Sequence, residues 1–114
     1  MKILILTKTV LAEKDIQKKL QTLGHEVFVS SKYLRDYLEN KLNRETVNYF
    51  SVCIISKTIS ESEANELFSK FNSQPYNFLR EVEKIPEALV NGSHSYVKEN
   101  ASIAELRETI ASLD

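Results

Sequence analysis

Three side chains that could take part in chemistry, Ser56, Lys57 and Thr58, follow the most apolar stretch of the chain. Residues 49–55 just before them contain one polar side chain and show no two-residue alternation, which predicts a strand covered on both faces of a parallel sheet. Open α/β folds place ligand and reaction sites at the carboxyl ends of such strands. Two hydroxyl groups and an ammonium group could hold an anion or a cofactor there, although none of the three is an acid, a thiol or an imidazole.

Residues that commonly build metal, redox or phosphate sites are few. Cys53, the lone cysteine, lies within the apolar stretch and is expected in the core. His25 and His94 are far apart in the sequence, and neither has a second ligand at metal-binding spacing. Gly24 and Gly92 are the only glycines, so a glycine-rich phosphate loop cannot be built. We therefore expect no metal and no cofactor.

Length and charge describe a single domain of ordinary composition. The 114 residues are 42% hydrophobic and 27% charged, which is enough to form a core without disulfides or metal. The formal net charge of -1 gives no electrostatic reason for this stretch to bind nucleic acid or an anionic membrane. The apolar run at residues 3–6 is too short for a signal peptide or a membrane span, so a cytoplasmic location is the default expectation.

Strand and helix patterns alternate along the whole chain. Strands are predicted at residues 2–6, 25–30, 50–55, 76–82 and 95–98, and helices at residues 10–23, 31–42, 60–71, 86–90 and 102–113. Gly24 ends the first helix, while Ser60 and Ser102 are N-caps and Glu105 completes a capping box. Five strand-helix units with right-handed crossovers predict a three-layer α/β/α sandwich of the flavodoxin-like class, with a parallel sheet of order 2-1-3-4-5.

Two finer expectations concern the carboxyl-terminal half of the chain. Arg80 and Glu81 near the end of the fourth strand indicate that this end faces solvent. The last helix is expected to turn four apolar side chains inward: Ile103, Leu106, Ile110 and Leu113.

Three segments resemble the receiver domain of bacterial response regulators. Residues 2–8 through 20–27 look like the family's opening strand, helix and leucine-glycine turn into the second strand. Residues 92–106 are similar to the family's fifth strand and the helix after it, and the strand before Ser56 resembles the one that ends in the phosphate-accepting aspartate. The resemblance covers nearly the whole chain and implies a single receiver-like domain, residues 1–114.

The residues at the family's reactive positions differ from the family's pattern. Where a receiver has two acids after its first strand, this chain has Thr7 and Lys8, and Ser56 stands at the phosphate-accepting position. The family's lysine position falls on Glu99, with Lys98 one residue early. Because Mg²⁺ requires carboxylate oxygens, the resemblance implies a degenerate receiver whose pocket has lost its negative charge and that neither binds the metal nor accepts phosphate.

Lys8 and Glu99 occupy two of these positions with their charges exchanged relative to the family. They could form an ion pair that fills the pocket and holds one conformation. They could equally be two solvated surface charges that contribute almost nothing to stability.

The resemblance implies a regulatory module without enzymatic activity. Such domains commonly precede a DNA-binding domain and pair through the fourth helix, fifth strand and fifth helix, so we expect a homodimer whose contact face includes Lys98, Glu105 and Arg107. DNA would be bound only through a further domain of a longer regulator. Two alternatives stay open: a stand-alone adaptor that binds another protein, and a small flavodoxin-like ligand-binding domain or enzyme that uses residues 56–58.

Overall fold

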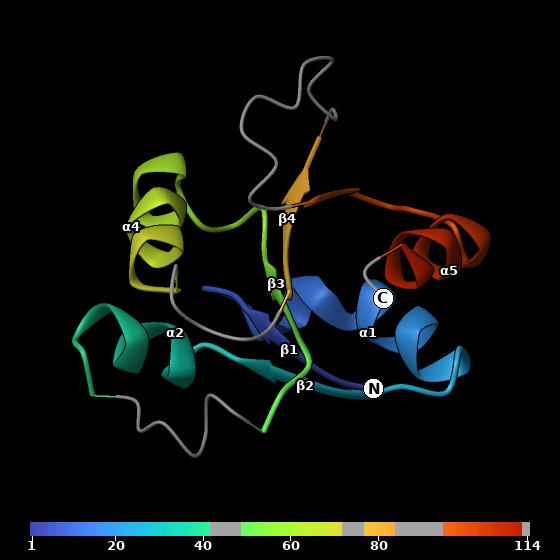
Figure 1. The fold of residues 1–114 in the computed structure, drawn as a ribbon, viewed down its shortest axis with the longest axis horizontal. Coiled ribbons are helices and arrows are strands. Elements are labelled where there is room, and N and C mark those ends of the chain that lie inside the picture. Colours follow the sequence, from blue (N-terminus) through green and yellow to red (C-terminus); the bar gives the residue numbers. More distant parts are fainter. Residues whose placement is uncertain (42–48, 72–76, 84–94, 113–114) are drawn as a thin grey trace.

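Five parallel strands form one sheet with helices on both of its faces (Figure 1). The computed structural model describes residues 1–41, 49–71, 77–83 and 95–112. The strands are β1 (Lys2–Leu6), β2 (Glu26–Ser30), β3 (Val52–Ile55), β4 (Asn77–Val82) and β5 (Ser95–Lys98). Their order in space is β2-β1-β3-β4-β5, which confirms the predicted parallel sheet and its order.

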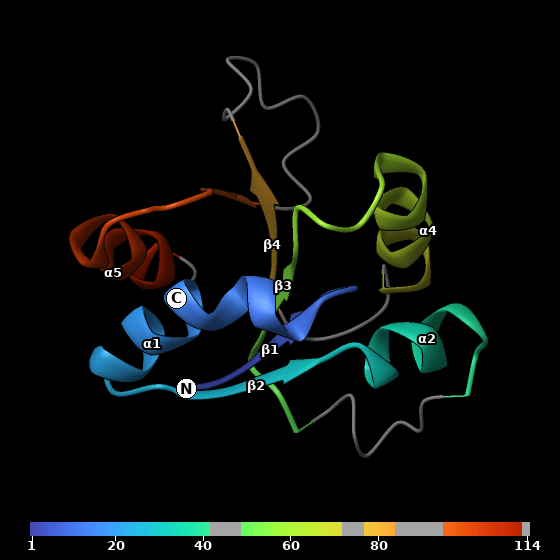
Figure 2. The ribbon, with the colours of Figure 1, turned by 180° about the vertical axis from the view of Figure 1, so that it is seen from behind.

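The helices divide between the two faces of the sheet. They are the 3-10 helix η1 (Val10–Glu13), then α1 (Lys14–Thr22), α2 (Lys32–Leu38), α4 (Glu61–Phe71) and α5 (Ile103–Ala111). Helices α2 and α4 cover one face, and α1 and α5 cover the other, as the front and back views show (Figures 1 and 2). The predicted three-layer sandwich is therefore confirmed.

Alternation along β1 and β3 sends their side chains into two separate cores. Leu4, Leu6, Cys53 and Ile55 pack toward α2 and α4. Their neighbours in sequence pack toward α1 and α5, and these are Ile3, Ile5, Val52 and Ile54. Since both faces are covered, neither strand shows polar alternation in its sequence. The same alternation decides which way the first residue beyond each strand points.

Polar caps set the helix ends as predicted, although two helices differ in extent. Ser60 Oγ accepts the Glu63 backbone N–H at 3.2 Å, and Ser102 forms a complete capping box. The helix predicted at 10–23 is a 3-10 turn followed by α1, and the helix predicted at 31–42 ends at Leu38. Asn40 has φ +60°, a left-handed conformation that cannot continue a right-handed helix.

Two predictions for the carboxyl-terminal half are wrong in part. Leu106 and Ile110 are buried, but Ile103 is 36% exposed, and Ala101 just before α5 joins the core instead. Glu81 is not solvent-facing but 5% exposed, because its carboxyl group turns back to a backbone N–H of the β3–α4 loop. The helix predicted at 86–90 and the side chain of Leu113 lie outside the described residues.

The turn after α1 allows a test of the backbone alone. Gly24 has φ +94°, and a Cβ added there would meet no atom within 4 Å. The substitution Gly24→Ala should therefore lower the free energy of unfolding by about 1 kcal/mol, from backbone conformation only. Gly24→Asn should lose less, because asparagine tolerates left-handed conformations better. Chemical unfolding followed by circular dichroism measures both, and an alanine variant as stable as the natural chain would contradict this account.

Candidate functional site

Three hydroxyl groups meet where β1 and β3 end. Leu6 pairs with Ile55 in the sheet, and the Ser56 backbone N–H donates to the Leu6 carbonyl oxygen at 3.0 Å, so Thr7 lies beside Ser56. Both side chains are fully buried and continue the alternation toward α1. Thr58 Oγ1 lies 3.0 Å from Thr7 Oγ1 and 3.1 Å from Ser56 Oγ. We call the space between these side chains the crevice.

A carboxylate occupies this crevice. Glu13 is 1% exposed, and its Oε1 accepts hydrogen bonds from Ser56 Oγ and, at 3.1 Å, from Thr7 Oγ1. A buried charge is tolerated when such donors surround it. The expectation that the crevice has lost its negative charge is therefore wrong.

The sequence carried a signal for Glu13 that we did not use. In the segment predicted as the first helix, Ala12 is exposed and Glu13 is buried. Glu13 precedes Ile16 by three residues and Leu20 by seven, the spacing of one helical face. An acid on the buried stripe is the pattern that indicates a partner inside the fold.

The loop that carries Ser56 is tied to the neighbouring strands by side chains. The Lys57 backbone N–H donates to Glu81 Oε1 at 3.1 Å, and Lys57 Nζ donates to Glu99 Oε2 at 2.5 Å. On the other face of the sheet, Arg80 Nη1 donates to the Ser56 carbonyl oxygen at 2.7 Å and Nη2 donates to the Ile59 carbonyl oxygen at 2.8 Å. Consecutive residues of β4 therefore hold both sides of the β3–α4 loop.

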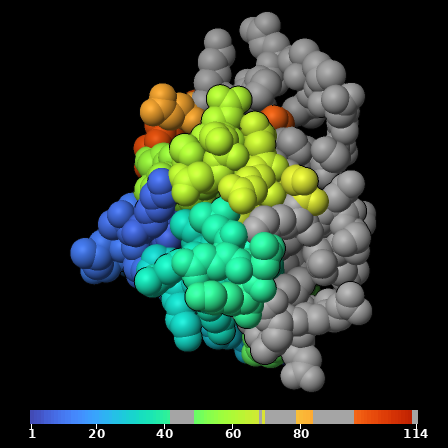
Figure 3. Space-filling model, turned by 90° about the vertical axis from the view of Figure 1, so that its left-hand side faces the viewer, coloured from blue at the N-terminus to red at the C-terminus, as the bar shows by residue number. Residues whose placement is uncertain are grey.

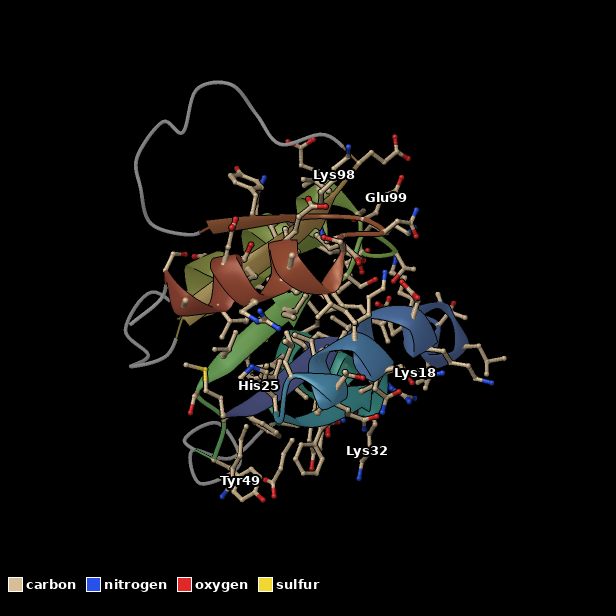
Figure 4. The ribbon with its side chains drawn as sticks, turned by 90° about the vertical axis from the view of Figure 1, so that its right-hand side faces the viewer. Lys18, His25, Lys32, Tyr49, Lys98 and Glu99 are labelled. Carbon is tan, nitrogen blue, oxygen red and sulfur yellow. The ribbon has the colours of Figure 1, made fainter. Side chains whose placement is uncertain are left out.

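The hypothesis of a Lys8–Glu99 ion pair is wrong. Lys8 Nζ lies 2.5 Å from Glu63 Oε1, in the first turn of α4, whereas Glu99 pairs with Lys57. Lys8 follows Thr7 and turns toward α4, so it leaves the side of the sheet where Glu99 lies. Lys98 and Glu99 sit together at the end of β5, and the Lys98 side chain is exposed (Figure 4).

Burial and hydrogen bonding change the pKa values of groups around the loop. Desolvation raises the pKa of the Glu81 carboxyl, and the hydrogen bond from the Lys57 backbone opposes this change. The hydrogen bond to Glu99 raises the pKa of the Lys57 ammonium group. Burial likewise raises the pKa of the Cys53 thiol, which is fully buried in the core as expected and is not a reactive group.

A groove lies on the α2 side of the molecule, apart from the crevice. This open groove beside Lys8 is lined on the α2 side by Ser31, Leu34, Arg35, Leu38 and Glu39. Figure 3 shows α2 and α4 next to each other on this face of the molecule. Among the described residues no group of three or more His, Cys, Asp or Glu side chains could hold a metal ion. None of the helices in the described ranges is long and apolar enough to span a membrane.

Comparison with known proteins identifies the fold. No protein-family model matches the sequence, and no curated protein matches it. A CheY-like receiver domain from Methylobacillus flagellatus is 14% identical, with a TM-score of 0.73, over 100% of this chain and 98% of that one. The fold is that of a receiver domain.

Two further receiver-fold structures show how widely this architecture is used. The receiver domain of a sensor histidine kinase from Pseudomonas aeruginosa, with magnesium coordinated in its active-site cleft, is 14% identical, with a TM-score of 0.66, over 98% of this chain and 95% of that one. An orphan response regulator of H. pylori is 20% identical, with a TM-score of 0.61, over 98% of this chain and 94% of that one. At these identities the likeness concerns the fold.

The buried carboxyl of Glu81 predicts a pH-dependent change in stability. Its pKa is raised above the ordinary value of 4.5, so the stability linked to this group is present at acid pH and is lost as the pH rises through the raised pKa. Glu81→Gln keeps an oxygen for the Lys57 N–H and removes the charge. It should raise the melting temperature by a few degrees at neutral pH, and by progressively less as the pH falls through the raised pKa of Glu81.

Thermal unfolding of the natural chain and the variant across this pH range measures the effect. Glu26→Gln, at an exposed position of β2, is the matched control and should show no such gain. A variant less stable than the natural chain at neutral pH would mean that attraction between Glu81 and Lys57 outweighs the cost of burial.

Proposed function

We propose that this domain is a receiver-like regulatory module that works without phosphorylation. The observation that carries the proposal is the hydrogen-bonded contact of Glu13 with Thr7 and Ser56 inside the crevice. The space at the carboxyl edge of the sheet is thereby filled by the chain's own side chains. A signal would then pass through contacts at the protein surface.

Both parts of receiver chemistry are disfavoured by this arrangement. Mg²⁺ needs several oxygen ligands with carboxylate charge, but the Glu13 oxygen in the crevice is already bonded to two hydroxyl groups, and the other crevice side chains carry hydroxyl groups only. Although a carboxylate contacts the Ser56 hydroxyl, that hydroxyl is fully buried, so a phosphate donor cannot approach it.

The ties on the β3–α4 loop support a single conformation. A switch needs an element with two arrangements of similar free energy. Here Arg80, Glu81 and Glu99 hold the loop from β4 and from the end of β5, and Glu13 holds it from η1. We infer that the module presents a constant surface, whose use is controlled by the concentration of its partner.

We propose that two copies of the chain form a homodimer. The contact surface lies at β5 and α5. Lys98 and Arg107 are exposed there and free to contact a partner's acidic groups. Glu105 caps the N-terminus of α5, because its carboxylate accepts the Ser102 backbone N–H at 3.3 Å. In this proposal DNA is bound only through a further domain of a longer cytoplasmic regulator.

The same site distinguishes the proposed function from one of its two alternatives. A flavodoxin-like ligand-binding domain or enzyme would need space at residues 56–58, and the buried Glu13 carboxylate counts against it. A stand-alone adaptor that binds another protein would use the same surface contacts as the regulatory module. It differs in having no DNA-binding domain on the same chain.

Incubation with acetyl phosphate or beryllofluoride and Mg²⁺ tests the absence of phosphorylation. We expect no phosphoryl adduct by intact-protein mass spectrometry, because Ser56 is buried and bonded to Glu13. The chain has no tryptophan, so metal binding is best followed by backbone amide chemical shifts, which should not change. The magnesium-binding Pseudomonas receiver domain is the positive control. An adduct, or a metal-dependent shift at Thr7 or Ser56, would contradict the proposal.

Charge reversal tests the pairing surface. The double variant Lys98→Glu and Arg107→Glu should weaken self-association at least about tenfold, because like charges would face the same acidic groups. Lys18→Glu makes the same kind of change on α1, away from Lys98, and should leave association unchanged (Figure 4). Sedimentation at several protein concentrations measures both. A natural chain that stays monomeric, or a double variant that pairs normally, would exclude this surface.

A further inference from the structure

In the short helix η1 the apolar side chains are exposed and the acidic side chain is buried. Its sequence is Val-Leu-Ala-Glu, yet Val10 is 43% exposed and Leu11 is 70% exposed, while Glu13 is 1% exposed. Burying a carboxylate costs free energy unless donors surround it, and exposing leucine and valine forfeits the gain from burying them. The bonds of Glu13 in the crevice must therefore hold this turn in place.

The crevice is organised to receive a carboxylate. Ser56 Oγ accepts the Thr58 backbone N–H at 3.1 Å, and Thr7 Oγ1 accepts the Thr9 backbone N–H at 3.1 Å. Because Ser56 Oγ already accepts the Thr58 N–H, its own proton is directed at Glu13 Oε1. The single proton of the Thr7 hydroxyl has two acceptors within reach, Glu13 Oε1 at 3.1 Å and the Thr9 carbonyl oxygen at 3.2 Å. Thr58 links this site to the chain after β1, because its Oγ1 accepts the Lys8 backbone N–H at 3.1 Å.

We propose that this crevice is a carboxylate-binding site whose ligand is supplied by the chain itself, as the side chain of Glu13. In a metal pocket, carboxylates line the site and a cation is the ligand. Here hydroxyl donors line the site and a carboxylate is the ligand. The bound carboxylate acts as a latch that keeps η1 closed over the ends of β1 and β3. This inference rests on the geometry of the crevice and does not depend on the regulatory role proposed above.

The surroundings select a small monoanion. Two hydroxyl groups converge on one oxygen, which fits a carboxylate, and within the described part of the chain no cationic side chain donates a hydrogen bond to Glu13. The charge of Glu13 also contributes to raising the pKa of the Glu81 carboxyl, so a second acid lies nearby. Phosphate, with a charge of about -1.5 to -2 at neutral pH, would meet that acid, and the Lys57 ammonium group, which interacts electrostatically with Glu13, is already paired with Glu99.

Removal of the latch and its replacement by a free anion test the proposal. Glu13→Ala should lower the melting temperature by roughly 10 °C, because two buried hydroxyl groups lose their acceptor. Sodium formate or acetate at about 0.1 M should restore a large part of this loss by binding the vacated site. Sodium chloride and sodium phosphate at equal ionic strength should restore much less.

Local readouts separate binding from a general salt effect. Backbone amide shifts of Lys8, Thr9 and Thr58 should move in Glu13→Ala and return toward the natural values when formate is added. If Glu13→Ala does not fold alone, recovery of the circular dichroism signal with formate but not with chloride is the same measurement.

Two further variants complete the design. Glu13→Gln keeps the side-chain volume and one oxygen acceptor, so it should lose less stability than Glu13→Ala and show no response to formate. Asp15→Ala removes an exposed acid two residues away, which pairs with Lys19, and should show neither a large loss nor a rescue. Equal stabilisation of all variants by formate, no specific rescue of Glu13→Ala, or a Glu13→Ala chain as stable as the natural one would overturn the proposal.

Discussion

Two buried hydroxyl groups at the ends of neighbouring strands require an acceptor, and the chemistry of this domain follows from how they obtain it. Strand alternation points Thr7 and Ser56 toward α1, where no solvent reaches them. Glu13 provides the acceptor by turning η1 inward. The result is a receiver fold in which Thr7, Ser56 and Glu13 are hydrogen-bonded to one another at the carboxyl edge of the sheet.

The same edge joins elements that are far apart in the sequence. Residues 56–59 contact η1 and the end of β1 on one side and β4 on the other, and Lys57 reaches the residue after β5. Exposed ion pairs such as Lys8–Glu63 add little stability by themselves. The buried or partly buried bonds to backbone groups matter more, because an unsatisfied N–H or C=O group away from water costs free energy. These bonds make the loop a structural junction.

The fold could be predicted from the sequence because its signals are local and agree with one another. Apolar runs without alternation indicated a covered parallel sheet, and Gly24, Ser60 and Ser102 marked helix ends at the right places. The positions of Thr7 and Ser56 could also be predicted, since they depend only on where β1 and β3 end. What fills the space between them could not be read from those two residues alone.

The errors at the candidate site concern where charged side chains lie and which groups they meet. Glu13 and Glu81 are buried because each satisfies a donor that belongs to another element. The Lys8–Glu99 pair was inferred from exchanged charges, but the direction in which consecutive side chains point separated them. The position of a carboxylate in a fold depends on the donors it can reach across the sheet. Sequence spacing along one helix can indicate that Glu13 is buried, but it does not identify the donors that Glu13 meets across the sheet.

The backbone of the β3–α4 connection has a consequence for how this chain can change. Four of its five amide groups are bonded: Ser56 to the Leu6 carbonyl, Lys57 to Glu81, Thr58 to the Ser56 hydroxyl and Ile59 to the Ser56 carbonyl. Surface connections usually accept inserted residues, because their backbone can bond to water instead. An inserted residue here would shift every one of these pairs, so the length of this connection is as constrained as that of the strand before it.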